Sequence, residues 1–316
     1  MGTDIRKRIL ELENLPSPPA LAAELIELTS REDVRIAQIA ALIERDPALT
    51  SKLLRHCNSA AYGLRHKVSS IERATVMLGI RQIKCLALGF VILTQSDMMR
   101  PKGFDFSHYW TRASVTAVSS RLLANQVLRA MAGEAFVAGL LQDIGVLLLE
   151  YIAPREYNAV AGAYACGGRR LHEIEETVLG VNHLEAGQAM LRGWGLPDLI
   201  CDSVAFHHYP QLYEGDRSIE EVIEVVAAAS EITNLFCEPH KGGSLERVLR
   251  VCAGFFHLRE EHVHDLLATV ADHVQESTWL FEIYDSKTLD YEQIRKEAQE
   301  ELQALGRATV SDAAVS

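Results

Sequence analysis

The chain has 316 residues, 48% of them hydrophobic, and a formal net charge of −12. This composition supplies ample material for a buried core, so we expect a globular protein. The acidic charge disfavours broad binding to nucleic acid or to anionic lipid, and therefore favours protein or small-molecule partners.

No membrane span or export signal is predicted. The longest apolar stretches, residues 85–93 and 135–150, are shorter than the roughly 20 residues that cross a bilayer. The N-terminal segment carries charges where a signal peptide needs an apolar core, so we predict a cytoplasmic protein. The six cysteines form no Cys-x-x-Cys pair, which indicates free thiols.

The first third of the chain has the pattern of consecutive amphipathic helices. Asp46 followed by Pro47 predicts a helix start, with an N-cap and a proline in the first turn. Ser69 or Ser70 is expected to begin a further helix, which stops at Gly79. No strand-like alternation occurs here, so the pattern predicts a helical lobe.

Helical periodicity continues through the rest of the chain, after a loop at residues 101–103. We predict an all-α fold with three parts. An N-terminal helical lobe spans residues 1–97, a second helical lobe spans residues 98–285, and a C-terminal helical extension spans residues 286–316. Residues 307–316 within the extension are predicted to be a flexible tail.

The stretch from Ala135 to Glu150 is apolar on every side except at Gln142 and Asp143. Such a pattern predicts one buried helix. An unpaired carboxylate inside it would cost several kcal/mol or more in lost solvation. Asp143 is therefore expected to be held by hydrogen bonds, a cation or a metal.

Several segments together resemble the HDOD domain, a bacterial signalling relative of the HD metal-dependent phosphohydrolases. The resemblance covers about residues 15–235 and implies a helical HD-like lobe and a role in signal transduction. The segments that carry it are LPSPP, IERDPALTSKLLRHCNSAAYG, VSSIERATVMLGIRQIKCLAL, FVAGLLQDIGVLLL, GVNHLEAGQAMLRGWGLP and VAFHHYP.

The resemblance implies a set of metal-binding positions, which this chain retains only in part. Arg112 stands where the family has an early His, Gln142 stands where it has the His of the His-Asp pair, and the late Asp falls near Ser230, with Glu231 beside it. The positions that match are Asp143, His183, His207 and His208.

Arg112 is expected to lie beside Asp143 and to replace the metal as its positive partner. We therefore expect a degenerate pocket without a bound metal. If iron, manganese or zinc does bind, the retained Asp and His residues would hold it. His183 has the alternative interpretation of a helix-start residue, and adjacent His207 and His208 would point about 100° apart on one helix, so that at most one faces the pocket.

The intact N-terminal motifs and the incomplete ligand set indicate a non-catalytic regulatory module that binds a signalling protein. The alternative is a phosphohydrolase that acts on a nucleotide or a cyclic dinucleotide with a reduced ligand set. Nucleic-acid binding is disfavoured by the charge. The C-terminal helix is interpreted as a connector, a homodimer contact or an ordinary packed helix.

Overall fold

The computed structural model describes residues 5–7, 9, 18–29, 34–59, 62, 67–95, 104–167, 169–277 and 289–313. Within these ranges the chain is helical and contains no strand, which confirms the all-α prediction. The predicted part boundaries near residues 97 and 285 lie outside the described residues and stay predictions.

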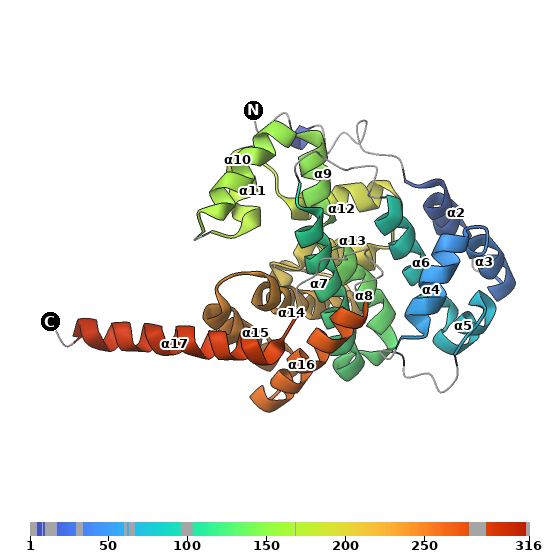
Figure 1. Ribbon diagram of the computed structural model, residues 1–316. Coiled ribbons are helices and arrows are strands. Elements are labelled where there is room, and N and C mark those ends of the chain that lie inside the picture. Colours follow the sequence, from blue (N-terminus) through green and yellow to red (C-terminus); the bar gives the residue numbers. More distant parts are fainter. Residues whose placement is uncertain are drawn as a thin grey trace.

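The N-terminal helices pack on one another at one side of the molecule (Figure 1). Asp46 caps one of them as predicted, because its carboxylate accepts hydrogen bonds from the backbone of Ala48 at 2.9 Å and Leu49 at 3.0 Å. Ser70 caps another. The helices are α2 (Ala20–Thr29), α3 (Ile36–Ile43), α4 (Pro47–Cys57), α5 (Ile71–Leu78) and α6 (Ile80–Gln95).

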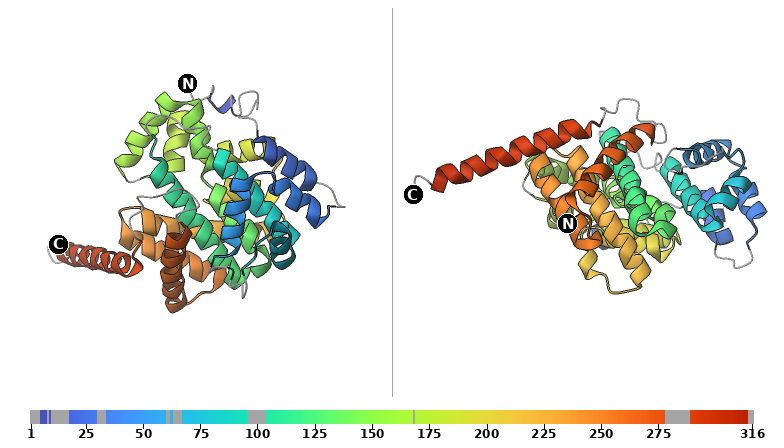
Figure 2. Two further views of the ribbon diagram at one scale, coloured as in Figure 1. Left: turned by 45° about the vertical axis from the view of Figure 1, so that its right-hand side comes forward. Right: turned by 90° about the horizontal axis from the view of Figure 1, so that it is seen from below.

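The remaining helices surround α7 and α8, which form the centre of the molecule (Figures 1 and 2). The central group is α7 (Phe106–Val127), the short 3₁₀ helix η3 (Arg129–Met131), α8 (Ala132–Leu141) and α9 (Ile144–Ile152). Around it lie α10 (Pro154–Ala165), α11 (Leu171–Leu179), α12 (His183–Gly193), α13 (Asp198–Phe206), the 3₁₀ helix η4 (Pro210–Leu212), α14 (Arg217–Cys237), α15 (Lys241–Phe256) and α16 (Glu260–Ser277).

The prediction of one helix from Ala135 to Glu150 is wrong. Helix α8 ends at Leu141, a turn follows, and α9 begins at Ile144. The break lets the backbone of α9 approach α12 closely: a Cβ on Gly145 would lie 2.0 Å from the carbonyl oxygen of His183. This contact places the turn residues Gln142 and Asp143 beside the start of α12.

The segment Arg129–Ile152, which contains α8 and α9, is long and apolar enough to cross a membrane, and 89% of it is buried inside the protein. It is the one such stretch within the described residues. Its burial is that of a core element, because side chains of α7, α12, α13 and α14 cover it.

Helix α17 (Tyr291–Ala313) packs on α15 through its first turns and then projects away from the body (Figure 1). Tyr291, Ile294 and Ala298 are its buried contacts. The helix continues to Ala313 and so includes most of the segment predicted to be a flexible tail; its flexibility stays a prediction. The segment after Gly306 contains no proline that would end it.

Candidate functional site

Asp143 lies in the turn between α8 and α9 and forms the centre of a cluster of histidines. Its Oδ1 atom is 3.6 Å from Nε2 of His183 and 3.6 Å from Nε2 of His207. Although Asp143 occupies the N-cap position of α9, its side chain makes no capping hydrogen bond. The carboxylate is directed to the histidines and not to its own helix.

His183 is the first residue of α12, and a buried carboxylate fixes its ring. Nδ1 of His183 is 2.6 Å from Oε2 of Glu175, which also accepts the His183 backbone N–H at 2.8 Å. The other oxygen of Glu175 accepts the Tyr157 hydroxyl at 2.8 Å. His183 therefore presents its Nε2 atom to Asp143, and this atom has no hydrogen-bond partner.

His207 follows the end of α13, and its Nδ1 N–H donates to the carbonyl oxygen of Val204 at 2.9 Å. This bond leaves Nε2 of the buried ring without a hydrogen-bond partner, in the direction of Asp143. The same arrangement, with Nδ1 held and Nε2 free, thus occurs in His183 and in His207.

His208 also belongs to the cluster, which contradicts the expectation that only one of the adjacent histidines faces the pocket. The rings of His207 and His208 are 4.1 Å apart between centroids, and His172 lies against His208 at 4.4 Å. The expectation assumed one continuous helix. Helix α13 ends at Phe206, so the two histidines lie in a turn where the helical separation of 100° does not apply.

Asp143, His183, His207 and His208 each offer one ligand atom, and these atoms lie within 4.8 Å of one another. One carboxylate and three imidazoles form a donor set that suits a divalent iron, manganese or zinc ion. The two unpartnered Nε2 atoms, with Nδ1 held by Glu175 or by a carbonyl, fit the way in which proteins orient metal-binding histidines. The residues that are present therefore fit one metal ion.

Arg112 of α7 lies near Asp143, as predicted, but its stronger contacts are elsewhere. Its Nε atom is 3.9 Å from Oδ2 of Asp143, whereas its Nη1 atom is 2.6 Å from Oε1 of Glu238. Its Nη2 atom donates to the side chain of Asn234 at 3.2 Å. Arg112 thus forms a bridge from the end of α14 to the edge of the cluster.

The other two predicted pocket residues lie differently. The amide nitrogen of Gln142 donates to Thr116 and to Asp143, each at 3.3 Å, and its buried carbonyl oxygen has no partner. Glu231 does not join the four ligand residues, because its carboxylate pairs with Arg247 at 3.0 Å and with Arg170 at 3.7 Å. Gln142 is therefore part of the site, and Glu231 lies at its rim.

The cluster changes the pKa values of its members in opposite directions. Burial raises the pKa of Asp143, but His207, His183 and Arg112 outweigh it and hold that pKa well below its ordinary value. Burial lowers the pKa of His183, but Glu175 and Asp143 overcome it and raise the pKa above 6.5. Burial lowers the pKa of His208 and lowers that of His172 to about 4, so both are neutral ring systems.

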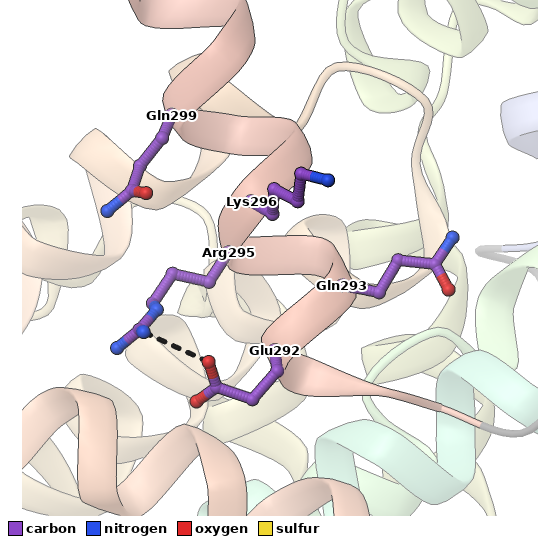
Figure 3. Close-up of a pocket in the computed structure, with 5 residues that line it drawn as sticks. All are labelled: Glu292, Gln293, Arg295, Lys296 and Gln299. Atoms are coloured by element: carbon purple, nitrogen blue, oxygen red, sulfur yellow. Dashed lines mark ion pairs between the residues drawn. The ribbon is translucent and has the colours of Figure 1, made fainter.

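A separate hollow runs along α17 and is shown in Figure 3. Polar side chains of this one helix line it, and Arg295 pairs with Glu292 across it at 2.9 Å. The hollow contains none of the histidines and carries no arrangement of acid, base or nucleophile. The histidine cluster is therefore the candidate functional site.

Sequence reasoning found the four ligand residues but missed Glu175 and Glu238. Glu175 is one of three glutamates in the segment 171–179, and only the packing of α11 on α12 distinguishes the fully buried one. Glu238 lies at the end of α14, 126 positions from Arg112. A spacing pattern within one element cannot reveal either contact.

Comparisons with known proteins show the family and the fold of the chain. Residues 15–210 match the HDOD domain. An uncharacterized protein of Treponema pallidum (strain Nichols) is 25% identical over 271 residues, which cover 84% of this chain and 50% of that protein. The chain therefore spans half the length of this relative.

Two solved structures share the fold. A "putative phosphohydrolase" of Shewanella amazonensis SB2B has a TM-score of 0.69 at 22% identity, covering 88% of this chain and 97% of that one. An HDOD domain protein of unknown function from Geobacter sulfurreducens has a TM-score of 0.63 at 21% identity, covering 97% and 96%. With the match over residues 15–210, the chain belongs to the HDOD domain family, a family related to the HD phosphohydrolases.

Proposed function

We propose that this chain is a regulatory module that acts by binding a signalling protein, and that its HD-like pocket has a structural and not a hydrolytic role. Membership of the HDOD family supports a regulatory or HD-related role. The observation that carries the finer proposal is the position of Arg112. Its guanidinium lies 3.9 Å from Asp143, at the edge of the ligand cluster.

A permanent positive charge at this place works against phosphohydrolase chemistry. Hydrolases with paired metals use both ions to stabilise the attacking and the leaving oxygen. Here Arg112 and Gln142 replace two histidines of the family pattern, and a second cation beside Arg112 would meet like-charge repulsion in a partly dehydrated site. The pocket can therefore accept one ion at most.

One ion would be held by Asp143, His183, His207 and His208. Bound there, it would supply Lewis acidity and would lower the pKa of a coordinated water. This chain's residues serve mainly to fix positions: Glu175 orients His183, and the Val204 carbonyl orients His207. Because the ligands come from the turn before α9, from α12 and from the turn after α13, the cluster ties these segments together.

The second candidate function is a phosphohydrolase that acts on a nucleotide or a cyclic dinucleotide with this reduced ligand set. The unpartnered Nε2 atoms of His183 and His207 favour it, because a metal ion would complete their bonding. Arg112 could then contact a substrate phosphate in place of a metal. This alternative requires turnover, which the regulatory proposal excludes.

An assay with metal-loaded protein separates the two functions. The full chain, incubated with Fe²⁺, Mn²⁺ or Zn²⁺, is offered bis(p-nitrophenyl) phosphate, nucleoside triphosphates and a cyclic dinucleotide. We expect no turnover above that of the Asp143→Ala variant. Metal-dependent turnover that disappears in Asp143→Ala and His183→Ala would establish the enzyme and overturn the regulatory proposal.

A further inference from the structure

The charges of the chain are distributed unevenly. Residues 47–95, which form α4 to α6 and their connections, contain seven Lys or Arg residues and one Glu, a net charge of +6. The rest of the chain carries −18, because the whole chain carries −12. This segment is therefore basic in an otherwise acidic sequence, which favours acidic partners, although one of its arginines, Arg81, is paired with Glu134 of α8.

Helix α5 adds apolar exposure to this basic segment. Val76 is 72% exposed and Met77 is 49% exposed. Among the strongly exposed large hydrophobic residues of the described ranges, these two alone are neighbours in the sequence. The other side of α5, with Ile71, Ala74 and Thr75, is buried against the lobe, so α5 cannot rotate to hide the exposed pair.

Arg73 lies three and four positions before Val76 and Met77, which places the three side chains on one face of the helix. Arg73 and the nearby Lys67 are exposed, and neither side chain has a partner among the described residues. The acidic residue of the segment, Glu72, is in the first turn of α5, where it complements the helix dipole. We define the α5 face as Arg73, Val76 and Met77, with Lys67 in the segment that leads into the helix.

The face is also accessible. Figures 1 and 2 show α5 at the outer edge of the N-terminal lobe, on the side of the molecule remote from α17. Helix α5 packs on α3, α4 and α6 through its buried side alone. Nothing in the described chain covers the exposed side.

From these observations we propose that the α5 face docks an acidic segment that carries large apolar side chains, such as an amphipathic helix of a partner protein. The proposal rests on the proposed function and specifies the surface and the chemistry of the partner. Methionine and valine would contact the apolar side of the segment, while Arg73 and Lys67 would meet its carboxylates. Apolar anchors supply most of the binding energy at such surfaces, and complementary charges raise the association rate.

The test measures binding of defined fluorescent peptides to the full chain by anisotropy. One 18-residue helical peptide repeats Leu and Glu at i, i+4 spacing, a second has every Glu replaced by Lys, and a third has every Leu replaced by Ser. We expect the acidic, apolar peptide to bind at least about tenfold more tightly than either control peptide, and its affinity to fall with added salt.

Variants locate the binding. Met77→Glu and Val76→Glu should each lower the affinity for the acidic peptide about tenfold or more. Arg73→Glu should lower this affinity several-fold and should reduce its dependence on salt. Matched controls are Leu212→Glu, at a residue 62% exposed in η4, and Arg250→Glu, at an exposed arginine of α15. Both controls should bind as the unaltered chain does.

Several results would overturn the proposal: no binding of the acidic peptide, equal binding of the basic peptide, or unchanged affinity in the three α5 variants. Because these residues are exposed, thermal melts should show that all variants fold. A protein captured from the source cell serves as a second arm. If the α5 variants still retain this protein, the α5 face is not its binding surface, and the proposed regulatory function stands. Metal-dependent turnover without any captured protein would instead refute the proposed regulatory function.

Discussion

Helix α7 carries a partly buried arginine, Arg112, and a fully buried one, Arg121, nine positions apart, that are accommodated in different ways. Arg112 is paired with the carboxylates of Glu238 and Asp143. Arg121 is only 2% exposed and has no carboxylate partner among the described residues. Its guanidinium lies 5.0 Å from the ring centre of Tyr62 and 5.4 Å from that of Phe136, and its Nη1 atom is 3.3 Å from Nε2 of His56.

The comparison shows that one helix can carry an arginine among carboxylates and another among aromatic rings. Arginine always donates, so the neutral ring of His56 must accept at Nε2, and aromatic faces supply the remaining attraction to Arg121. At the other site, removal of the arginine would take the near cation from Glu238 and would leave Asp143 with only His183, His207 and Gln142 beside it. Replacement of arginine by methionine should therefore lower the free energy of unfolding by different amounts at positions 112 and 121.

The largest effect is expected for Arg112→Met. This change leaves Glu238 without its closest cation, removes one of the positive neighbours of Asp143, and should destabilise the fold by about 3 kcal/mol. The double variant Arg112→Met with Glu238→Gln should recover much of the loss, because coupled partners are not additive. Urea unfolding with chelator present measures both, with Arg250→Met as the surface control. Simple additivity of the single effects would show that Arg112 and Glu238 are not a functional pair.

Arg121→Met should cost less than Arg112→Met by about 2 kcal/mol, since the cage of Tyr62, Phe136 and His56 holds no carboxylate that would be left unpaired. Methionine keeps much of the volume and retains contact with the aromatic rings. The same urea titration gives the answer. Equal losses of unfolding free energy in the two variants would mean that the aromatic surroundings of Arg121 stabilise the fold as much as the ion pair of Arg112 does.

The pH dependence of stability should differ in sign between the two regions. The raised pKa of His183 means that its stabilising contribution is full below pH 6.5 and is lost as the pH rises through the folded-state value. Burial and then Arg121 lower the pKa of His56 well below 6.5. Unfolded chains therefore bind a proton that the folded chain does not, and stability falls as the pH drops below 6.5.

Replacement of each histidine isolates its contribution. In His183→Gln, less stability should be lost as the pH rises, and in His56→Gln, less should be lost as the pH falls. Unfolding is measured in chelator-containing buffers between about pH 5 and pH 9. His172 and His208, whose pKa values are also lowered, remain in both variants and keep part of the acid slope. Parallel pH profiles for the unaltered chain and His183→Gln would contradict the assignment of a raised pKa to His183.

The sequence predicted much of the fold, because local signals determine it. Asp46 and Ser70 cap helices as expected, and Asn58 bridges α4 to Val68 with hydrogen bonds of 2.8 Å in both directions. The break after Leu141 was missed because apolar periodicity does not reveal the close approach of Gly145 to α12. A small residue in a helix has several explanations until its neighbour is known.

The ligand residues of the site could be predicted from the sequence, whereas the residues that orient them could not. The resemblance to the HDOD family brought together Asp143, His183 and the histidine pair, whereas the turn that admits both His207 and His208 depends on where α13 ends. Glu175 and Glu238 act through tertiary contacts of α11 and α14. Arg112 was predicted as the partner of Asp143, and the structure divides it between Asp143 and the shorter contact with Glu238.

The most direct test of the central claim is the number of metal ions that each chain binds. The full chain is unloaded with chelator, titrated with Zn²⁺, Mn²⁺ or Fe²⁺ under anaerobic conditions, and analysed by mass spectrometry of the intact protein. Our account predicts no more than one ion per chain, lost in His183→Ala, because Arg112 occupies the edge of the cluster where a second cation would lie. Two ions per chain, both dependent on Asp143, would contradict it.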